Sequence, residues 1–196
     1  MYKTIAPLLL ASQSPRRHQL LNQMGINFSH TSADIVELQK PVERALDFVV
    51  RMAQEKAFAV AADYPESWVL TADTIVVIDG EILGKPVSAS DACSMLSRLA
   101  GRWHQVFTAF TLQNYGLSTI ISKVDSSQVK ISPLSQSTIS AYVACGEPLD
   151  KAGSYAVQGV GGAFVEAIKG SPTTVIGLPL HLVIEQLLEN RIIALN

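Results

Sequence analysis

Charged residues are scarce in this chain of 196 residues: Asp, Glu, Lys and Arg make up 16%, and the formal net charge is −2. A chain with so little positive charge lacks the broad basic surface that binding to nucleic acid or to an anionic membrane requires. Hydrophobic residues make up 48%, which excludes an intrinsically disordered chain. We therefore expect a folded protein with one good core, and a single domain over residues 1–196.

Long apolar runs are also missing. No stretch reaches the roughly 18 apolar residues that a membrane-spanning helix needs. The short apolar segment Ile5–Ala11 is followed at once by polar and basic residues, which is not typical of a signal peptide. The two cysteines, Cys93 and Cys145, lie in apolar helical patterns. We expect both to be reduced core residues of a cytoplasmic protein.

Several motifs of known chemistry are absent. The four histidines and two cysteines show no metal-ligand spacing and no HExxH pattern. There is no GxSxG nucleophile elbow and no GxxxxGK phosphate-binding loop. The glycine-rich segment 159–162 is too short a pattern to identify a nucleotide site. These absences exclude the common zinc proteases, the serine hydrolases of the elbow type and the P-loop enzymes.

Strand-helix units and hairpins alternate along the chain. An apolar strand at 8–11 precedes a helix for which Ser14 is a good N-cap, Pro15 a good first residue and Gly25 a stop. The further patterns predict helices over 41–64, 89–100 and 135–145 and a last helix from Pro179, with a capping box of Ser88 and Asp91 at the start of the second of these. They predict a strand in 26–37 that runs into a loop, strands at 68–72 and 74–78, and antiparallel strands within 106–132. They also predict a hairpin at Asp79-Gly80 and a turn followed by a strand in 153–165. This order predicts an α/β fold with a mixed twisted sheet and flanking helices.

Two arginines, Arg16 and Arg17, stand in the first turn of the first predicted helix. The positive end of the helix dipole disfavours cations, so two of them there suggest a bound anion. Free backbone N–H groups at a helix start, the hydroxyls of Ser12 and Ser14 and two guanidinium groups would together suit a phosphate. The alternative is a pair of exposed arginines in an ordinary first turn.

Two carboxylates are placed to meet that phosphate. Asp73 follows the strand at 68–72, and Glu37 lies in the loop after the second strand. Ligands collect at the carboxyl ends of strands in α/β sheets, and paired carboxylates beside a polyphosphate most often hold Mg²⁺. A carboxylate there can instead accept a proton from water. Lys85 would add a cation, although turn, loop and surface roles remain the alternatives for all three residues.

Lys56 shares one face of the predicted long helix with Ala45, Val49 and Met52. This face is apolar, so the pattern allows two interpretations. Lys56 either extends to solvent at the edge of a packed face or carries a functional charge inward. Residue patterns alone therefore lead as far as a metal-assisted phosphate or polyphosphate site.

Six segments in sequence resemble one known family. LLLASQSPRRHQLL, RMAQEKA, TADTIVVIDGEILGKP, GRWHQVFTA, EPLDKAGSYAVQGVGGAFV and VIGLPL are similar to the Maf-like nucleoside triphosphate pyrophosphatases, in the order of that family and across nearly the whole chain. The resemblance implies a single Maf-like domain with two lobes around a central cleft, similar to the inosine triphosphate pyrophosphatases. It further implies hydrolysis of a nucleoside triphosphate to the monophosphate and pyrophosphate, with a divalent cation such as Mg²⁺, Mn²⁺ or Co²⁺.

The resemblance also implies roles for individual residues. Asp73 matches the catalytic aspartate, usually described as the proton acceptor. The positions linked to substrate choice are Arg16, Thr74 and Gln158. The remaining polar residues that line the cleft are Ser12, Arg17, Glu37, Lys56 and Lys85. We expect Glu37 and Asp73 to hold the metal, and Ser12, Arg17, Lys56 and Lys85 to bind phosphates. The resemblance thus favours the functional interpretation of Lys56.

Within the family, the segments SPRR, ADTIVV and YAVQGVGG are similar to the branch that acts on dTTP and UTP. A pyrophosphatase for 7-methyl-GTP or another purine nucleotide is the alternative inside the family. The alternative that is not an enzyme is a nucleotide-binding regulator of septum formation or cell division. We expect a nucleotide as the partner, no nucleic acid or membrane, and a homodimer by resemblance.

Overall fold

The computed structural model describes all residues, 1–196, and the chain divides into two compact units. The first unit comprises Met1–Asp73, Thr108–Asp125 and Gly177–Asn196, and the second comprises Thr74–Phe107 and Ser126–Ile176. Strands β4, β6 and β7 each continue from one unit into the other along the chain. Both units are therefore assembled from separate segments of sequence, and one domain over residues 1–196 stays a prediction.

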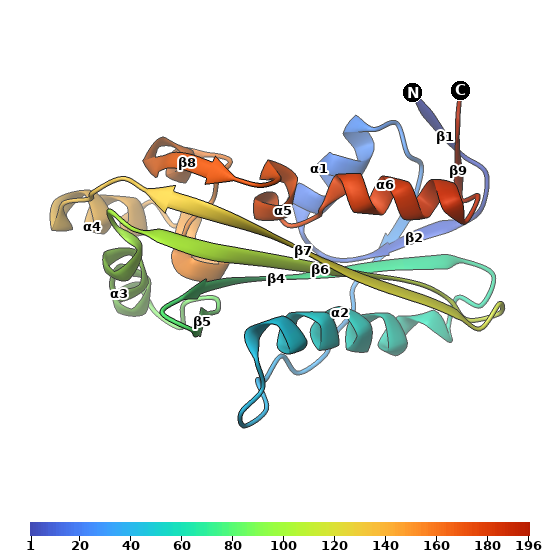
Figure 1. Ribbon diagram of the computed structural model, residues 1–196, viewed down its shortest axis with the longest axis horizontal. Coiled ribbons are helices and arrows are strands. Elements are labelled where there is room, and N and C mark those ends of the chain that lie inside the picture. Colours follow the sequence, from blue (N-terminus) through green and yellow to red (C-terminus); the bar gives the residue numbers. More distant parts are fainter. The chain divides into compact units, whose positions relative to one another are not determined.

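The main sheet has seven strands in the order β3-β2-β4-β6-β7-β8, with β5 paired to β4. The strands are β2 (Leu8–Ala11), β3 (Ser29–Thr31), β4 (Trp68–Ile78), β5 (Glu81–Leu83), β6 (Trp103–Asn114), β7 (Thr119–Ile131) and β8 (Val165–Lys169). Strand β2 is parallel to β3 and β4, whereas β4–β5 and β7–β8 are antiparallel. The predicted mixed sheet is thus confirmed. The ends of the chain, β1 (Tyr2–Thr4) and β9 (Ile193–Leu195), form a separate antiparallel pair (Figure 1).

Six α-helices flank the strands, as the α/β prediction requires. They are α1 (Pro15–Gln23), α2 (Ala45–Ala61), α3 (Ala89–Leu99), α4 (Gln136–Ala144), α5 (Pro172–Ile176) and α6 (Leu180–Glu189). Three short 3-10 helices lie between α4 and β8: η1 (Glu147–Asp150), η2 (Ala152–Ser154) and η3 (Val160–Phe164). None of these helices combines the length and the apolar composition needed to cross a membrane.

In the first unit, helix α2 covers one face of the strands, and α1 and α6 lie on the other face (Figure 1). Strand β2 is apolar and fully buried, because helices pack on both sides of it. Leu9 of β2, Val69 of β4 and Val60 of α2 belong to one buried cluster. Met52 and Val49, on the stripe of α2 that also carries Lys56, are completely buried.

The second unit has its own core, centred on α3 and α4, which pack against each other. The buried cluster comprises Val76, Ile78, Leu83, Ala92, Leu96, Leu99, Val106, Val129, Ile131, Ile139, Tyr142, Val143 and Tyr155. The predicted start of α3 is confirmed, since Ser88 Oγ accepts a hydrogen bond from the Asp91 amide at 3.1 Å. The predicted hairpin is confirmed as well: Asp79 and Gly80 join β4 to β5 with φ of 54° and 79°, as a type I′ turn requires.

Some predicted elements differ from the structure. The second strand is short, Ser29–Thr31, and it runs, as predicted, into an irregular loop that bears Glu37 and continues to α2. The segment 153–164 forms 3-10 turns in place of a strand, which begins only at Val165. Glycines 153 and 159, with φ of 67° and 96°, favour these turns over an extended strand. The expected end of a strand before Asp73 is also wrong, because β4 continues to Ile78.

The prediction for the cysteines is half wrong. Both are free thiols, and Cys93 is partly buried against the core of the second unit. Cys145 is exposed, because it follows the last residue of α4 and lies at the helix end. It lies two positions after Val143, the last buried residue of α4.

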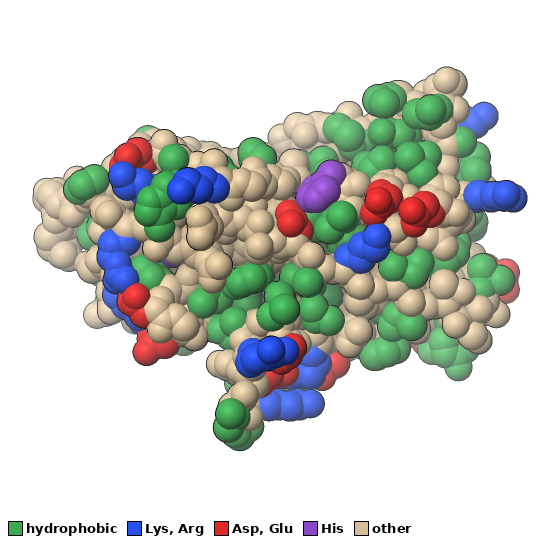
Figure 2. Space-filling view, viewed as in Figure 1, with side chains coloured by type: hydrophobic (Ala, Val, Ile, Leu, Met, Phe, Trp, Pro, Cys, Tyr) green, Lys and Arg blue, Asp and Glu red, His purple; other side chains and the backbone are tan.

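Charges of both signs are mixed on the surface. On the face shown in Figure 2, Lys and Arg side chains lie next to Asp and Glu side chains, and none of that face is broadly basic. Ion pairs within the first unit include Lys123–Glu185, and those within the second include Arg98–Glu81. This mixture agrees with the small net charge of the chain.

Candidate active site

The register of β2 and β4 determines where the predicted residues of the first unit meet. Leu8, Leu9 and Leu10 pair in parallel with Trp68, Val69 and Leu70. Continuing the same offset by two residues places Ser12, just after the end of β2, beside Ala72 and next to Asp73. Asp73 therefore lies in the interior of β4 but at the carboxyl end of β2, where the turn into α1 begins.

One face of β4 is directed at helix α2. Alternate residues of a strand share a face, so Val69, Thr71 and Asp73 point the same way. Thr71 Oγ1 donates a hydrogen bond of 2.6 Å to the carbonyl of Ala53 on α2. Asp73 Oδ1 accepts one of 2.6 Å from Nζ of Lys56, one helical turn further along α2. The packing of this helix on this strand thus brings the two charges together.

Lys56 joins two carboxylates. Its Nζ lies 2.6 Å from Asp73 Oδ1 and 2.7 Å from Glu37 Oε1. The side chains of Lys56 and Asp73 are only 12% and 11% exposed, whereas that of Glu37 is 44% exposed. Lys56 does not extend to solvent, so the structure decides between its two interpretations in favour of an inward charge. Such a charge inside a protein requires partners, and the two carboxylates supply them.

The turn between β2 and α1 is fastened by Ser12 and Arg17. Ser12 Oγ accepts hydrogen bonds from the Ser14 amide at 3.2 Å and from Arg17 Nη1 at 3.1 Å. Arg17 Nε donates to the carbonyl of Gly177 at 2.8 Å, which connects the turn to the segment before α6. His18 Nε2 lies 2.8 Å from the carbonyl of Ser12.

This turn offers fewer free backbone N–H groups than we predicted. The Ser14 amide is bound to Ser12 Oγ, and the Arg17 amide donates to the Ser14 carbonyl at 3.2 Å. Pro15 has no N–H. The predicted set of free amides therefore does not include these three residues. Ser14 is the N-cap residue by position, but its side chain makes no capping hydrogen bond.

Electrostatic coupling connects the turn with the carboxylates. Burial lowers the pKa of the Arg17 guanidinium, because it disfavours the charged form; the carboxylates of Asp73 and Glu37 oppose this shift, and Arg16 adds to it. Arg16, Arg17 and Lys56 are cations, and Glu37 and Asp73 are anions. The formal charges of these five side chains sum to one positive charge, which suits an anionic ligand.

The other three predicted residues belong to the second unit. Thr74 follows Asp73 in β4, Lys85 is exposed after β5, and Gln158 is partly buried between η2 and η3. The segment around Gln158 is held by Glu147, whose carboxylate accepts hydrogen bonds of 2.9 Å from the amides of Val160 and Gly161. That Thr74, Lys85 and Gln158 face the same ligand as the cluster of the first unit stays a prediction.

Two side chains that position these loops were missed in the sequence. Arg51 of α2 binds Glu43 and the Leu38 carbonyl in the loop that carries Glu37. Tyr142 of α4 donates a hydrogen bond of 2.8 Å to Glu147. Glu43 lies outside the helix of Arg51, and Glu147 lies outside the helix of Tyr142. Helical spacing therefore gives no signal for either pair. The segment RMAQEKA, which begins at Arg51, was a signal for the first of these side chains.

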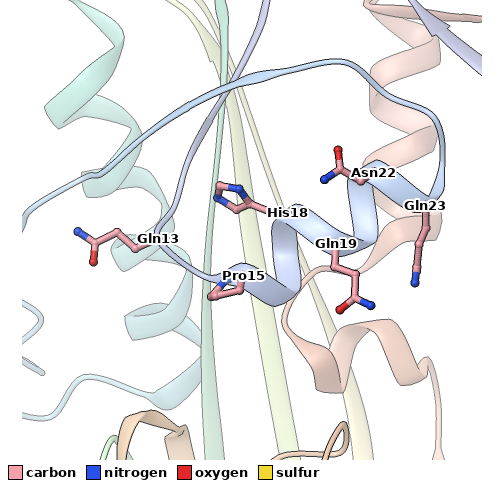
Figure 3. Close-up of a pocket in the computed structure, with 6 residues that line it drawn as sticks. All are labelled: Gln13, Pro15, His18, Gln19, Asn22 and Gln23. Atoms are coloured by element: carbon pink, nitrogen blue, oxygen red, sulfur yellow. The ribbon is translucent and has the colours of Figure 1, made fainter.

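An open pocket of about 660 Å³ lies along α1. Gln13, Pro15, His18, Gln19, Asn22 and Gln23 line it (Figure 3). None of the predicted site residues is among them, and no lining residue is a carboxylate or a permanent cation. This hollow therefore does not compete with the charged cluster as the candidate site.

Curated relatives match the chain over nearly its full length. A dTTP/UTP pyrophosphatase of Desulfotalea psychrophila is 47% identical over 197 residues and is covered completely, as is this chain. The dTTP/UTP pyrophosphatase of Geobacter metallireducens is 47% identical, covering 92% of this chain and 94% of the relative. That of Myxococcus xanthus is 46% identical, covering 88% and 87%.

Solved structures give a much weaker likeness. A Ham1 protein of Staphylococcus aureus aligns with a TM-score of 0.49 and 11% identity over 94% of this chain and 99% of its own. A HAM1 protein from Coxiella burnetii aligns with a TM-score of 0.42 and 14% identity over 65% and 73%. Similarity this low assigns neither fold nor activity, and the fold class rests on the strand order given above.

The family itself is shown by direct sequence matching. The model of the family described as Maf-like protein matches residues 7–190, a range that contains every residue of the charged cluster. Together with relatives of 45–48% identity, this match confirms the resemblance predicted from the six segments. The chain belongs to the Maf-like protein family.

Proposed function

We infer that this chain is a nucleoside triphosphate pyrophosphatase that hydrolyses dTTP and UTP to the nucleoside monophosphate and pyrophosphate. Three relatives named dTTP/UTP pyrophosphatase are 46–47% identical to this chain along most or all of their length. The observation that carries the inference is the ion-pair cluster of Lys56, Asp73 and Glu37 beside Arg16 and Arg17. Its carboxylates can bind a water molecule or a metal ion, and its cationic side chains can bind a polyphosphate.

We assign the triphosphate to the cationic side chains. Lys56 uses two of its three N–H groups on carboxylates, so a third can be donated to a phosphate oxygen. Ser12 Oγ accepts two hydrogen bonds, which leaves its proton for a phosphate oxygen. Arg16 and Arg17 suit paired phosphate oxygens through their planar forks, and Lys85 adds a further point charge.

The carboxylates fit a divalent cation that arrives with the nucleotide. No group of three or more His, Cys, Asp or Glu side chains in the structure forms a complete metal site. Mg²⁺ commonly uses only one or two protein carboxylates and takes its remaining ligands from phosphates and water. Glu37 and Asp73 match that donor set and would hold Mg²⁺, Mn²⁺ or Co²⁺. When bound, such an ion neutralises phosphate charge and acidifies water.

The reaction needs a water held in line with the bond to be broken. Asp73 Oδ1 accepts the bond from Lys56, and Oδ2 can accept the proton of a water molecule. The oxygen of this water then attacks the α-phosphorus, and the bond from that phosphorus to the α,β-bridging oxygen breaks. Pyrophosphate leaves with the electron pair of that bond. Positioning and charge neutralisation by the cationic side chains supply most of the rate enhancement.

Base selection is assigned to Arg16, Thr74 and Gln158. The hydroxyl of Thr74 and the amide of Gln158 can each donate and accept hydrogen bonds, as the edge of uracil or thymine requires. A site that pairs its polar groups with a base rejects a base that leaves them unpaired. Held in one orientation, donating to O4 and accepting from N3–H, these groups would disfavour cytosine, which presents the opposite pattern.

The deciding experiment measures pyrophosphate release from dTTP, UTP, CTP, dCTP, GTP and 7-methyl-GTP with Mg²⁺, Mn²⁺ or Co²⁺, and again after treatment with EDTA. The Asp73→Asn variant removes the proton acceptor but keeps the volume of the side chain. Asp47→Asn is the matched control, because Asp47 is an exposed carboxylate on the surface of α2 paired with Arg44. We expect the wild type to release pyrophosphate from dTTP and UTP. EDTA or the Asp73→Asn substitution should abolish this release, and the Asp47→Asn variant should keep it.

The other outcomes point to the alternatives. Release from 7-methyl-GTP or GTP alone would keep the chemistry and reject the assigned specificity. Tight nucleotide binding without release from any nucleotide would favour a regulator of septum formation or cell division. Full activity after EDTA treatment would reject the metal.

The homodimer and the cytoplasmic location stay predictions. Light scattering of the purified protein at several concentrations tests the first, since a dimer doubles the mass of 21.1 kDa. Fractionation of cells that produce the protein tests the second.

A further inference from the structure

Arg51 of α2 is the centre of a second ion-pair network in the first unit. Its Nε and Nη2 donate hydrogen bonds of 2.6 Å and 2.7 Å to the two carboxylate oxygens of Glu43, in the paired geometry that arginine and carboxylate favour. Its Nη1 donates to Glu55 at 2.9 Å, and its guanidinium lies 5.5 Å from the centre of the Phe48 ring. The side chains of Arg51 and Glu43 are only 18% and 10% exposed.

The network holds a loop that has no strand or helix of its own. Residues 32–44 connect β3 to α2 without regular structure. Arg51 Nη2 donates a hydrogen bond of 2.9 Å to the carbonyl of Leu38, and Glu43 accepts one of 2.9 Å from the Lys40 amide. The loop is thus tied to α2 at Leu38 and at Glu43, on either side of Lys40. The residue directly before Leu38 is Glu37.

Charge strengthens this attachment. The hydrogen bonds from Arg51 lower the pKa of the Glu43 carboxyl from its ordinary 4.5 to about 2. The Arg51 pKa is raised by its bonds to Glu43 and Glu55. Glu43 therefore stays charged well below neutral pH.

We propose that Arg51 is a positioning residue: by binding Glu43 and the Leu38 carbonyl, it fixes the loop 32–44 so that Glu37 reaches Lys56 and the substrate. The proposal rests on the inferred pyrophosphatase reaction, in which Glu37 acts at the site. Arg51 itself makes no contact with Lys56 or Asp73 in this role. Arg51 and Lys56 both lie on α2, so this helix supports both the central cation of the site and the loop that supplies its second carboxylate.

The first test needs no substrate. Hydrogen exchange is followed in peptides that cover residues 35–43 of the wild type, of Arg51→Ala and of Arg44→Ala. Arg44 is the matched control, because it also pairs with a carboxylate near the start of α2 but is 77% exposed and binds no loop carbonyl. We expect at least tenfold faster exchange in the loop of Arg51→Ala, with unchanged exchange in α6 and in the control variant. Unchanged exchange in the loop would overturn the proposal whatever the activity.

The second test is a double-mutant cycle on dTTP hydrolysis with Arg51→Ala and Glu37→Gln. Loss of a side chain that orients a metal or substrate ligand typically lowers activity by about 10- to 100-fold. If Arg51 acts through Glu37, each single variant lowers kcat/KM by about that factor and the double variant is no worse than Glu37→Gln. Multiplied losses would show an independent structural role and reject the proposal.

Two further variants separate positioning from folding. Arg51→Lys keeps the charge but lacks the planar fork that pairs with both Glu43 oxygens while also reaching the Leu38 carbonyl, so we expect it to remain impaired. If Arg51→Ala does not fold, Glu43→Gln weakens the same attachment from the loop side and should also give fast loop exchange. A wild type that hydrolyses neither dTTP nor UTP rejects the inferred reaction, and the exchange experiment still decides whether Arg51 holds the loop.

Discussion

Nζ of Lys56 lies 2.6 Å from Oδ1 of Asp73, which joins the middle of helix α2 to the middle of strand β4. Both side chains are nearly buried, and Glu37 approaches the same nitrogen from a loop at 2.7 Å. The pair thus provides a charge of each sign at one point, held by packed backbone on both sides. Such rigid placement is what catalysis by positioning requires.

Replacing Lys56 by Met should damage stability and activity together. The variant leaves Asp73 shielded from solvent and without its cation, and breaking a buried pair in this way costs about 3–5 kcal/mol. We expect a value near the lower end, because Glu37 is partly exposed. Urea unfolding followed by circular dichroism measures the free energy, and pyrophosphate release from dTTP measures the activity.

The control for this variant is Lys123→Met, since Lys123 pairs with Glu185 but both side chains are well exposed. Exposed pairs contribute about 0–1 kcal/mol, so this variant should resemble the wild type. Adding Asp73→Asn to Lys56→Met removes the unpaired charge and should recover part of the stability. Equal stability of Lys56→Met and Lys123→Met would contradict the assigned ion pair.

Substitution of the two arginines of the first turn should affect stability and activity differently. Arg17→Ala removes the hydrogen bonds to Gly177 and Ser12, and groups left without a partner cost about 1–3 kcal/mol. Arg16→Ala should lower the activity toward dTTP with a smaller loss of stability. Thermal unfolding and kcat/KM of both variants check this, and an Arg17→Ala protein as stable as the wild type would show that the turn is held by other contacts.

Gly161 is a sensitive position in the segment after Gln158. A Cβ there would lie 2.6 Å from the carbonyl oxygen of Ala156 and would also collide with Tyr142 Oη. Because this oxygen is backbone, relief requires the segment to move, and overpacking of this kind costs about 1–3 kcal/mol. Gly161→Ala should therefore lower the melting temperature.

Gly84→Ala is the matched variant, since nothing lies within 4 Å of a Cβ at Gly84. Calorimetry of the two variants should show a clear decrease only for Gly161→Ala. A decrease of equal size in both would mean that backbone freedom, and not the collision, limits the stability at Gly161.

Stability should decrease in weakly acidic solution because of His104. This side chain is 3% exposed, its Nε2 lies 2.7 Å from Tyr155 Oη, and its Nδ1 is buried without a hydrogen-bond partner. Burial lowers its pKa from 6.5 to about 4. The folded state thus favours the neutral ring, so the contribution to stability is complete above pH 6.5 and is lost as the pH falls toward 4. A pKa difference of this size corresponds to about 3 kcal/mol of unfolding free energy.

Unfolding free energies measured between pH 7 and pH 5 test this, because most carboxylates stay charged over that range. His104→Gln should flatten the dependence of the unfolding free energy on pH. A slope that persists in His104→Gln would assign the effect to other groups.

Local patterns in the sequence were sufficient to predict much of the architecture. The start of α1 at Pro15, the Ser88–Asp91 contact before α3 and the Asp79-Gly80 hairpin depend on neighbours within a few residues. Such contacts are set by propensity and capping chemistry, which short segments of sequence contain. The interval from Trp68 to Ile78 was divided wrongly, because a polar pair inside an apolar run is typical of a strand end.

Contacts between distant segments could not be predicted in this way. The exposure of Cys145 depends on where α4 ends against its neighbours, and the pairing of Arg51 with Glu43 depends on the path of an irregular loop. No periodicity relates these partners. The family resemblance identified residues of the candidate site, but it carried no information on which of them touch.

The sequence by itself determined the family, the alternation of strands and helices, and the types of charged residues available near the first turn. Only the tertiary structure decided that Lys56 turns inward to two carboxylates, that Asp73 lies inside β4, and that Arg51 ties down the Glu37 loop. The reason is physical: local preferences act between neighbours in sequence, whereas an inward charge is stable only when packing brings its partners from other segments.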